Sequence, residues 1–161
     1  MKIYYREKSG GIEILRCFGI EGRVEIPGMI DGKLVISAVP YAFSSHMDEK
    51  EDLKNASLWE VSDGLEFGRE EHVLAGNDVE EIVFPYTLKE IGRYIFYGCG
   101  NLKKLEFSDS LMQIGCGAFT GCHALEKLTV HMRQGKKSGV KEMLGEMWQR
   151  IDVNFLYEYE E

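Results

Sequence analysis

The feature that most constrains this chain is an apolar pattern that recurs every 23 residues. Between Asn101 and Phe119, large apolar residues stand at fixed positions: Leu102, Leu105, Phe107, Leu111, Ile114 and Phe119. Stepping back by one repeat gives a second set without a gap: Val79, Ile82, Phe84, Leu88, Ile91 and Phe96. Stepping forward from the first three gives Leu125, Leu128 and Val130. A unit of this size cannot bury its own apolar face, so the repeat predicts coils that stack on one another.

The spacing inside one unit predicts how each coil is built. Leu105 and Phe107 alternate with period two, as in a short strand, so equivalent strands from successive units should form a parallel sheet. The next apolar pair, Leu88 and Ile91 in the preceding unit, predicts the opposite wall. An aromatic residue then fills the corner, and a glycine two residues later allows the chain to turn back.

Further units are predicted on the N-terminal side. The segment from Asn55 to Leu65 lies two repeats before Asn101, and its sequence W-E-V-S-D-G-L matches L-E-F-S-D-S-L. We therefore predict a coil there, followed by a degenerate stretch up to Val73 in which Gly68 replaces the usual isoleucine. An acidic loop over residues 44–54 separates this coil from an earlier half-unit, which is marked by three residues: Val35, Ala38 and Phe43.

The C-terminal end is predicted to close the stack differently. One repeat after Leu128 and Val130 lie Ile151 and Val153, so a strand is expected there in phase. Apolar residues at helical spacing predict a helix from Gly139 to Arg150, with a serine before it as the cap. Terminal repeats are expected to be atypical, because one face of the stack must meet water.

These patterns predict one domain covering residues 1–161. It would comprise an N-terminal β cap (1–34), the repeats with the acidic loop (35–137) and a C-terminal cap (138–161).

The repeat resembles the BspA-like class of leucine-rich repeats. The resemblance rests on the pattern I-x-F-P-x-x-L-x-x-I-G-x-x-x-F-x-G-C-x-x-L from Ile82 to Leu102, which continues from Leu105 to Leu125 with serine in place of proline. It implies a leucine-rich-repeat solenoid, a right-handed α/β-type superhelix of mostly short parallel strands and turns, with a β-rich N-terminal cap and a helix-bearing C-terminal cap. Members of that class include adhesins and surface proteins, so the resemblance implies recognition of a protein or ligand.

Composition and charge narrow the choice of partner. The net charge is −8 and the pI is about 5.1, which argues against nucleic acid and anionic membranes as main partners. The charged start of the chain lacks the apolar core of a secretory signal, and no window approaches the roughly 20 apolar residues of a membrane span. We therefore expect a cytoplasmic protein with reduced cysteines, and export by a non-standard route stays open as the alternative.

The cysteines offer the sharpest alternative to a binding function. Cys99 and Cys122 occupy one repeat position, where small side chains can satisfy turn backbone in the neighbouring coil. A metal- or thiol-dependent enzyme would instead use Cys116, Cys122 and His123. The chain has no C-x-x-C pair and no phosphate-binding glycine loop, so we predict no catalytic residue, no cofactor and no metal.

We predict that function lies on the exposed face of the stacked strands. The side chains that alternate with the buried ones point outward, and they supply the candidate partner-binding residues: Leu58, Glu60, Glu81, Val83, Lys104, Glu106, Lys127 and Thr129. A basic corner is expected late on this face, where His131 joins the lysines. The expected partner is a protein that the sequence does not name, and self-association through an end cap is an additional possibility.

Overall fold

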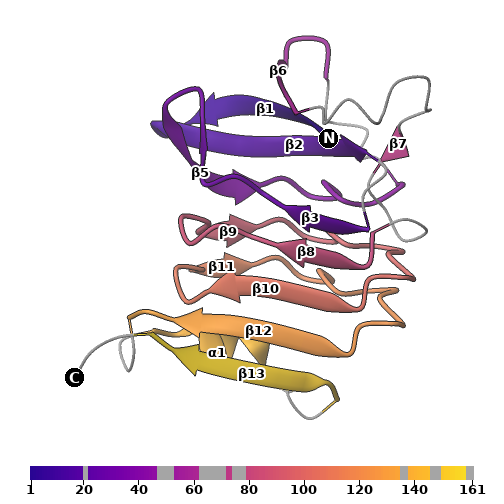
Figure 1. Ribbon diagram of the computed structural model, residues 1–161, viewed down its shortest axis with the longest axis vertical. Helices are drawn as coiled ribbons and strands as arrows, with labels where there is room; N and C mark the ends of the chain where they lie inside the picture. The colour runs from indigo at the N-terminus through magenta and orange to yellow at the C-terminus, as the bar shows by residue number, and fades with distance from the viewer. Residues whose placement is uncertain are drawn as a thin grey trace.

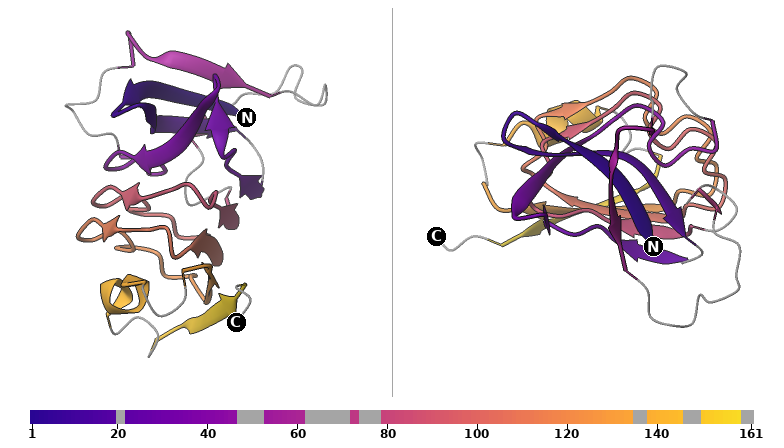
Figure 2. Two further views of the ribbon diagram at one scale, coloured as in Figure 1. Left: turned by 90° about the vertical axis from the view of Figure 1, so that its left-hand side faces the viewer. Right: turned by 90° about the horizontal axis from the view of Figure 1, so that it is seen from above.

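The computed structural model describes residues 1–19, 22–46, 53–61, 72–73, 79–134, 138–145 and 150–158. The elements are, in chain order, β1 (Lys2–Lys8), β2 (Gly11–Gly19), β3 (Arg23–Glu25), β4 (Met29–Ile30), β5 (Lys33–Ala38), β6 (Ser57–Glu60), β7 (His72–Val73), β8 (Glu81–Val83), β9 (Glu90–Ile91), β10 (Lys104–Ser108), β11 (Gln113–Ile114), β12 (Lys127–Met132), α1 (Val140–Leu144) and β13 (Asp152–Tyr157). They stack along one axis with the N-terminal strands at one end and α1 and β13 at the other (Figure 1). Seen along this axis, the coils lie over one another (Figure 2, right).

The first wall is a five-stranded sheet in the order β13-β12-β10-β8-β3, and all its strand pairs are parallel. Ile82 pairs with Leu105, and Leu105 pairs with Leu128, so the predicted 23-residue register is confirmed across β8, β10 and β12. These three side chains are buried in the core, as their alternation with polar residues requires.

The second wall consists of strands as well, in the order β11-β9-β5-β2-β1-β6. Ala38 pairs with Ile91, and Ile91 with Ile114, while the amide of Phe43 donates a hydrogen bond to the carbonyl of Ile95. The predicted half-unit around Ala38 and Phe43 is therefore confirmed. Because both walls are built of short strands, the described part of the chain is a β-solenoid with a single five-residue helix.

The prediction of a coil at residues 55–65 is wrong for the residues that the structure describes. β6 pairs antiparallel with β1, at the edge of the second sheet, and Trp59 lies opposite Ile3. The coil next to β8 is instead supplied by β3, where Val24 pairs with Ile82. The sequence V-E-I-P after Arg23 places its two apolar side chains at the same inward positions as I-V-F-P does from Ile82 onward. In β6, by contrast, Trp59 is half-buried and the other three side chains are exposed. Residues 62–71, which include Gly68 of the predicted degenerate stretch, and residues 47–52 of the acidic loop lie outside the described residues.

The C-terminal strand is offset from its predicted register. Leu128 pairs with Val153, which lies 25 residues later rather than 23. The intervening helix explains the difference, because a helix rises about 1.5 Å per residue and a strand about 3.3 Å, so a helical connection needs more residues for the same span. The helix begins after Gly139, and the Ser138 hydroxyl accepts a hydrogen bond from the amide of Val140. The remainder of the predicted helix, residues 146–149, lies outside the described residues.

Aromatic rings join successive coils through the core. Phe96 is fully buried, and its ring centroid lies 6.0 Å from those of Phe43 and Phe84 and 5.9 Å from that of Phe119. Phe43, Phe96 and Phe119 occupy the corner that the repeat predicts for them, and Phe84 packs against this corner from the end of β8. No helix in the described part of the chain is long and apolar enough to span a membrane.

Candidate functional site

The exposed face of the first wall carries two rows of aligned side chains. Strand register places Arg23, Glu81, Lys104, Lys127 and Asp152 in one row, and Glu25, Val83, Glu106, Thr129 and Asn154 in the other. We call this surface the strand face. Six of the eight predicted binding residues lie on it. The other two, Leu58 and Glu60, do not, because β6 pairs with β1 at the far edge of the second sheet.

Charges on the strand face are unevenly compensated. Arg23 forms ion pairs with Glu25 and Glu81. Lys104 and Lys127 lie directly opposite each other on β10 and β12, and neither forms an ion pair with another described residue. Like charges in directly opposed positions destabilise a sheet. Each lysine also lies opposite an acidic residue on its other side, Glu81 for Lys104 and Asp152 for Lys127. The two adjacent ammonium groups therefore form a positive centre that is flanked by carboxylates.

At the carboxyl end of this face, His131 is held between two carboxylates. Its Nε2 contacts Glu106 and its Nδ1 contacts Glu158, and its ring packs 5.2 Å from that of Tyr86. Burial alone would lower the pKa of His131, but the hydrogen bonds and charges of the two carboxylates outweigh it and raise the pKa above its usual range. The prediction that His131 adds to an exposed basic corner is wrong, because its imidazole is largely buried and already paired.

The His131→Gln substitution is expected to cost more stability at about pH 6 than at about pH 9. Since folding raises the pKa of His131, its charged contacts stabilise the folded state below the unfolded pKa, and this contribution is lost as the pH rises through the folded pKa. Melting temperatures of both proteins across this range measure the difference. The exposed His123 supplies a control, since His123→Gln should leave the melting curve nearly unchanged throughout. A His131 effect that grows with pH would contradict the assignment.

The strand face is hollowed on both sides of Tyr86. One hollow of about 350 Å³ is lined by residues that include Glu25, Val83 and His131. Another, of about 310 Å³, is lined by polar groups that include Asp109 and Arg133. Arg133 lies over the Tyr86 ring, 4.5 Å from its centroid. The half-exposed tyrosine therefore stands between two recesses that could take side chains of a partner.

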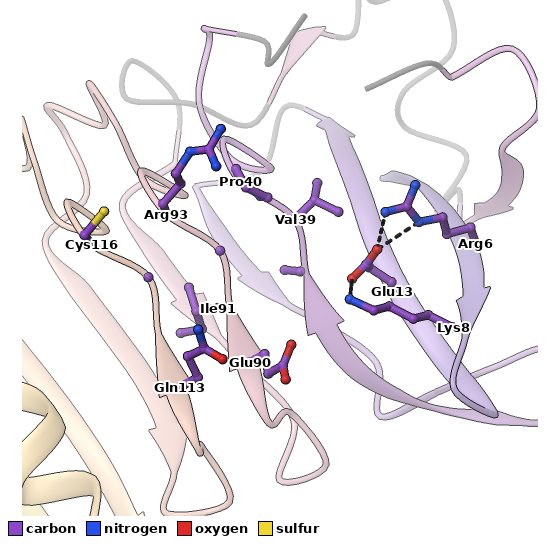
Figure 3. Close-up of a pocket in the computed structure, with 13 residues that line it drawn as sticks. Arg6, Lys8, Glu13, Val39, Pro40, Glu90, Ile91, Arg93, Gln113 and Cys116 are labelled. Carbon is purple, nitrogen blue, oxygen red and sulfur yellow. Dashed lines mark hydrogen bonds and ion pairs between the residues drawn. The ribbon is translucent and has the colours of Figure 1, made fainter. Parts of the chain in front are cut away.

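A separate groove of about 410 Å³ lies on the second wall (Figure 3). The groove is lined by residues of β1, β2, β5, β9 and β11 and of the turns that follow these strands. Its polar side chains belong to Arg6, Lys8, Glu13, Glu90, Arg93 and Gln113. The sequence analysis missed this site. The alternation of polar residues within β2, β9 and β11 was visible, but only the folded register shows that they align.

The cysteines have the structural role expected from the repeat. Cys99 donates a hydrogen bond from its thiol to the carbonyl of Phe43, and Cys122 donates one to the carbonyl of Phe96, each in the preceding coil. Burial raises the pKa of Cys122 to about 11, so its thiol is protonated at neutral pH and is a poor nucleophile. Within the described ranges, no group of three or more His, Cys, Asp or Glu side chains could hold a metal ion. The arrangement gives no support to an enzyme built on Cys116, Cys122 and His123.

The stacked parallel strands, corner phenylalanines and turn cysteines together define a leucine-rich-repeat solenoid. Residues 70–139 match the family described as "BspA type Leucine rich repeat region (6 copies)". Residues 70–139 thus carry BspA-type leucine-rich repeats, as the repeat pattern predicted.

The chain is similar to two solved structures of leucine-rich proteins. A leucine rich cell surface protein from Faecalibacterium prausnitzii is 20% identical, with a TM-score of 0.50 over 80% of this chain and 31% of its own. The chain thus spans about a third of the length of that relative. The T. pallidum leucine rich repeat protein is 17% identical, with a TM-score of 0.36 over 97% of this chain and 80% of its own. No curated protein sequence matches the chain.

Proposed function

We propose that this protein is a non-catalytic interaction module that binds a protein partner through the strand face. The observation that carries the proposal is the pair of adjacent lysines, Lys104 and Lys127, which form no ion pair with another described residue and lie at the centre of a five-stranded parallel face. Half-buried apolar surface at Val83 and the recesses beside Tyr86 flank them. Repeat proteins commonly bind along such extended surfaces, and a partner with acidic groups would relieve the repulsion between the lysines.

A double substitution on the strand face tests this proposal. Val83→Thr keeps the shape of the side chain, and Lys104→Gln removes the charge without placing a second carboxylate opposite Glu81, so the fold should be preserved. The affinity for a partner first captured with the unmodified protein is expected to fall about tenfold or more, as for the loss of central contacts in an interface. Binding is measured by calorimetry, and thermal melting should be nearly unchanged.

The matched control removes the two predicted residues that the fold places elsewhere. Leu58→Ala with Glu60→Ala changes an exposed pair on β6, at the edge of the other sheet, and should leave the affinity unchanged. Full binding by the strand-face variant, or loss of binding by the β6 variant, would overturn the proposed surface.

For the cellular location, we propose the cytoplasm expected from the sequence. None of the four cysteines forms a disulfide, which fits a reducing compartment. The structural relative from F. prausnitzii is a cell surface protein, so fractionation of cells that make the protein decides between the two locations. Recovery in the envelope fraction would contradict the proposal.

A further inference from the structure

The groove on the second wall is built around a buried carboxylate. The side chain of Glu13 is only 4% exposed. Its Oε1 accepts hydrogen bonds from Nε and a terminal nitrogen of Arg6, at 2.8 and 2.5 Å, and its Oε2 accepts one from Lys8 Nζ at 3.0 Å and one from the Ser37 hydroxyl at 2.8 Å. Burial would raise the pKa of Glu13, but these bonds outweigh it and lower the pKa. The charged carboxylate therefore fixes two cationic side chains, both half exposed, at one end of the groove (Figure 3).

The strand register continues this polar site across the wall. Arg6 pairs with Glu13, Glu13 with Ser37, Ser37 with Glu90, and Glu90 with Gln113. The five side chains form one row over β1, β2, β5, β9 and β11. We call it the polar row.

The far end of the polar row presents groups that the fold leaves available. The side chains of Glu90 and Gln113 are exposed, and neither forms a side-chain hydrogen bond with another described residue. Adjacent strands lie about 4.8 Å apart, so Glu90 on β9 is about 14 Å from β1, three strands away, which carries the cationic residues. A carboxylate and an amide thus stand at one end of the groove, and ammonium and guanidinium groups at the other.

The geometry points to a binding site for an extended peptide segment that carries an acidic and a basic side chain four residues apart, so that both point to the same side of the segment. The acidic side chain would meet Lys8, and the basic one would meet Glu90. Four residues of extended chain span about 13 Å, which matches the separation of β1 and β9. A single amino acid is too short to reach both. The Gln113 amide, which both donates and accepts hydrogen bonds, suits the backbone of such a segment.

This site is separate from the strand face and does not depend on the function proposed for it. Three cationic and two anionic side chains line the groove, in a protein whose net charge is −8. Local charge of the opposite sign favours a ligand with an acidic end and sets its orientation along the polar row.

Titration of the full-length protein with three synthetic peptides tests the inference. The first, acetyl-Glu-Thr-Val-Thr-Lys-amide, has the required spacing. The second places the two charged residues next to each other, and the third replaces lysine with glutamine. Chemical shifts of backbone amides report both the site and the affinity. The expected result is saturable change at Lys8, Glu90 and Gln113 with the first peptide, and affinities about threefold lower with the other two, the effect of one exposed ion pair.

Charge variants separate a specific site from general attraction. Glu90→Gln should weaken binding of the first peptide about threefold and leave the third unchanged, because only the first has a lysine to lose its partner. Glu90→Lys should reverse the preference and favour a peptide with glutamate at both ends. Glu126→Gln, an exposed glutamate outside the groove, should have no effect. Each variant should keep the amide spectrum of the folded protein. Equal binding of all three peptides, an equal effect of Glu90→Gln on the first and third, or the absence of saturable shifts at the groove would overturn the inference.

Discussion

Replacing Phe96 with alanine is expected to lower the free energy of unfolding by about 3–5 kcal/mol. The side chain is fully buried and contacts the rings of Phe43, Phe84 and Phe119, so its removal leaves a cavity that opens toward three neighbouring rings. In a repeat protein each coil packs only on its neighbours, and a domain's whole stability is about 5–15 kcal/mol. The loss should therefore threaten the stack as a whole. Chemical denaturation followed by circular dichroism measures it.

Phe119 supplies the matched control for this prediction. It occupies the same repeat position one coil later but is only partly buried, because it lies near the C-terminal end of the ring stack. Phe119→Ala should cost clearly less than Phe96→Ala. Equal losses would mean that the rings do not act as a continuous stack.

Gly115→Ala is expected to destabilise the protein by about 1–3 kcal/mol or more, through overpacking. A Cβ at this position would lie 2.2 Å from the Arg93 backbone nitrogen and 2.5 Å from the Arg93 Cα. Both atoms belong to the backbone of the preceding coil, so the clash is relieved only if the coils separate. The equivalent Gly92 meets the Pro40 nitrogen at 2.3 Å, which shows that the close approach recurs along the stack. Thermal and chemical unfolding of the variant measure the loss.

Gly100 provides the comparison within the same chain. Nothing lies within 4 Å of a Cβ added there, and its backbone is not in the left-handed region. Gly100→Ala should leave stability unchanged or raise it slightly, because alanine restricts the unfolded chain. If Gly115→Ala were tolerated as well as Gly100→Ala, coil spacing would not be set by these glycines.

The repeat from Val79 to Val130 could be predicted because stacking fixes each inward position to the same register. A one-residue slip would turn every strand's apolar side chains outward, so the sequence must keep strict phase there. Cys99 and Cys122 were predictable for the same reason, since each thiol has to reach the carbonyl of the coil before it.

The first coil was not recognised, because its parts are far apart in the chain. β3 is followed by the hairpin of β4 and β5, and β6 then pairs with β1 before the chain returns at β8. The four residues of β6 match the repeat in sequence. They nevertheless pair with the edge of β1 that is not hydrogen-bonded to β2. The match of V-E-I-P after Arg23 to I-V-F-P at Ile82 was the signal that could have located the first coil.

The two proposed binding surfaces also differ in how far the sequence could predict them. Residues on β8, β10 and β12 could be placed on the strand face from alternation alone, because the repeat had already fixed their neighbours. The polar row needs β1 and β2 in one sheet with β9 and β11, which lie more than 50 residues later and are joined to them through β5. Only the fold shows that Glu13 and Glu90 share one surface.

The most direct test of the central claim is site-specific photo-crosslinking to the bound partner. A photoreactive residue is introduced in place of Lys104 on the strand face, Leu58 on β6 or Met112 before β11, all of which are exposed. The partner is captured once from native cells and then added to each purified protein. We predict a crosslink from position 104 and none from positions 58 and 112. A crosslink from either of the other positions without one from 104 would contradict binding through the strand face.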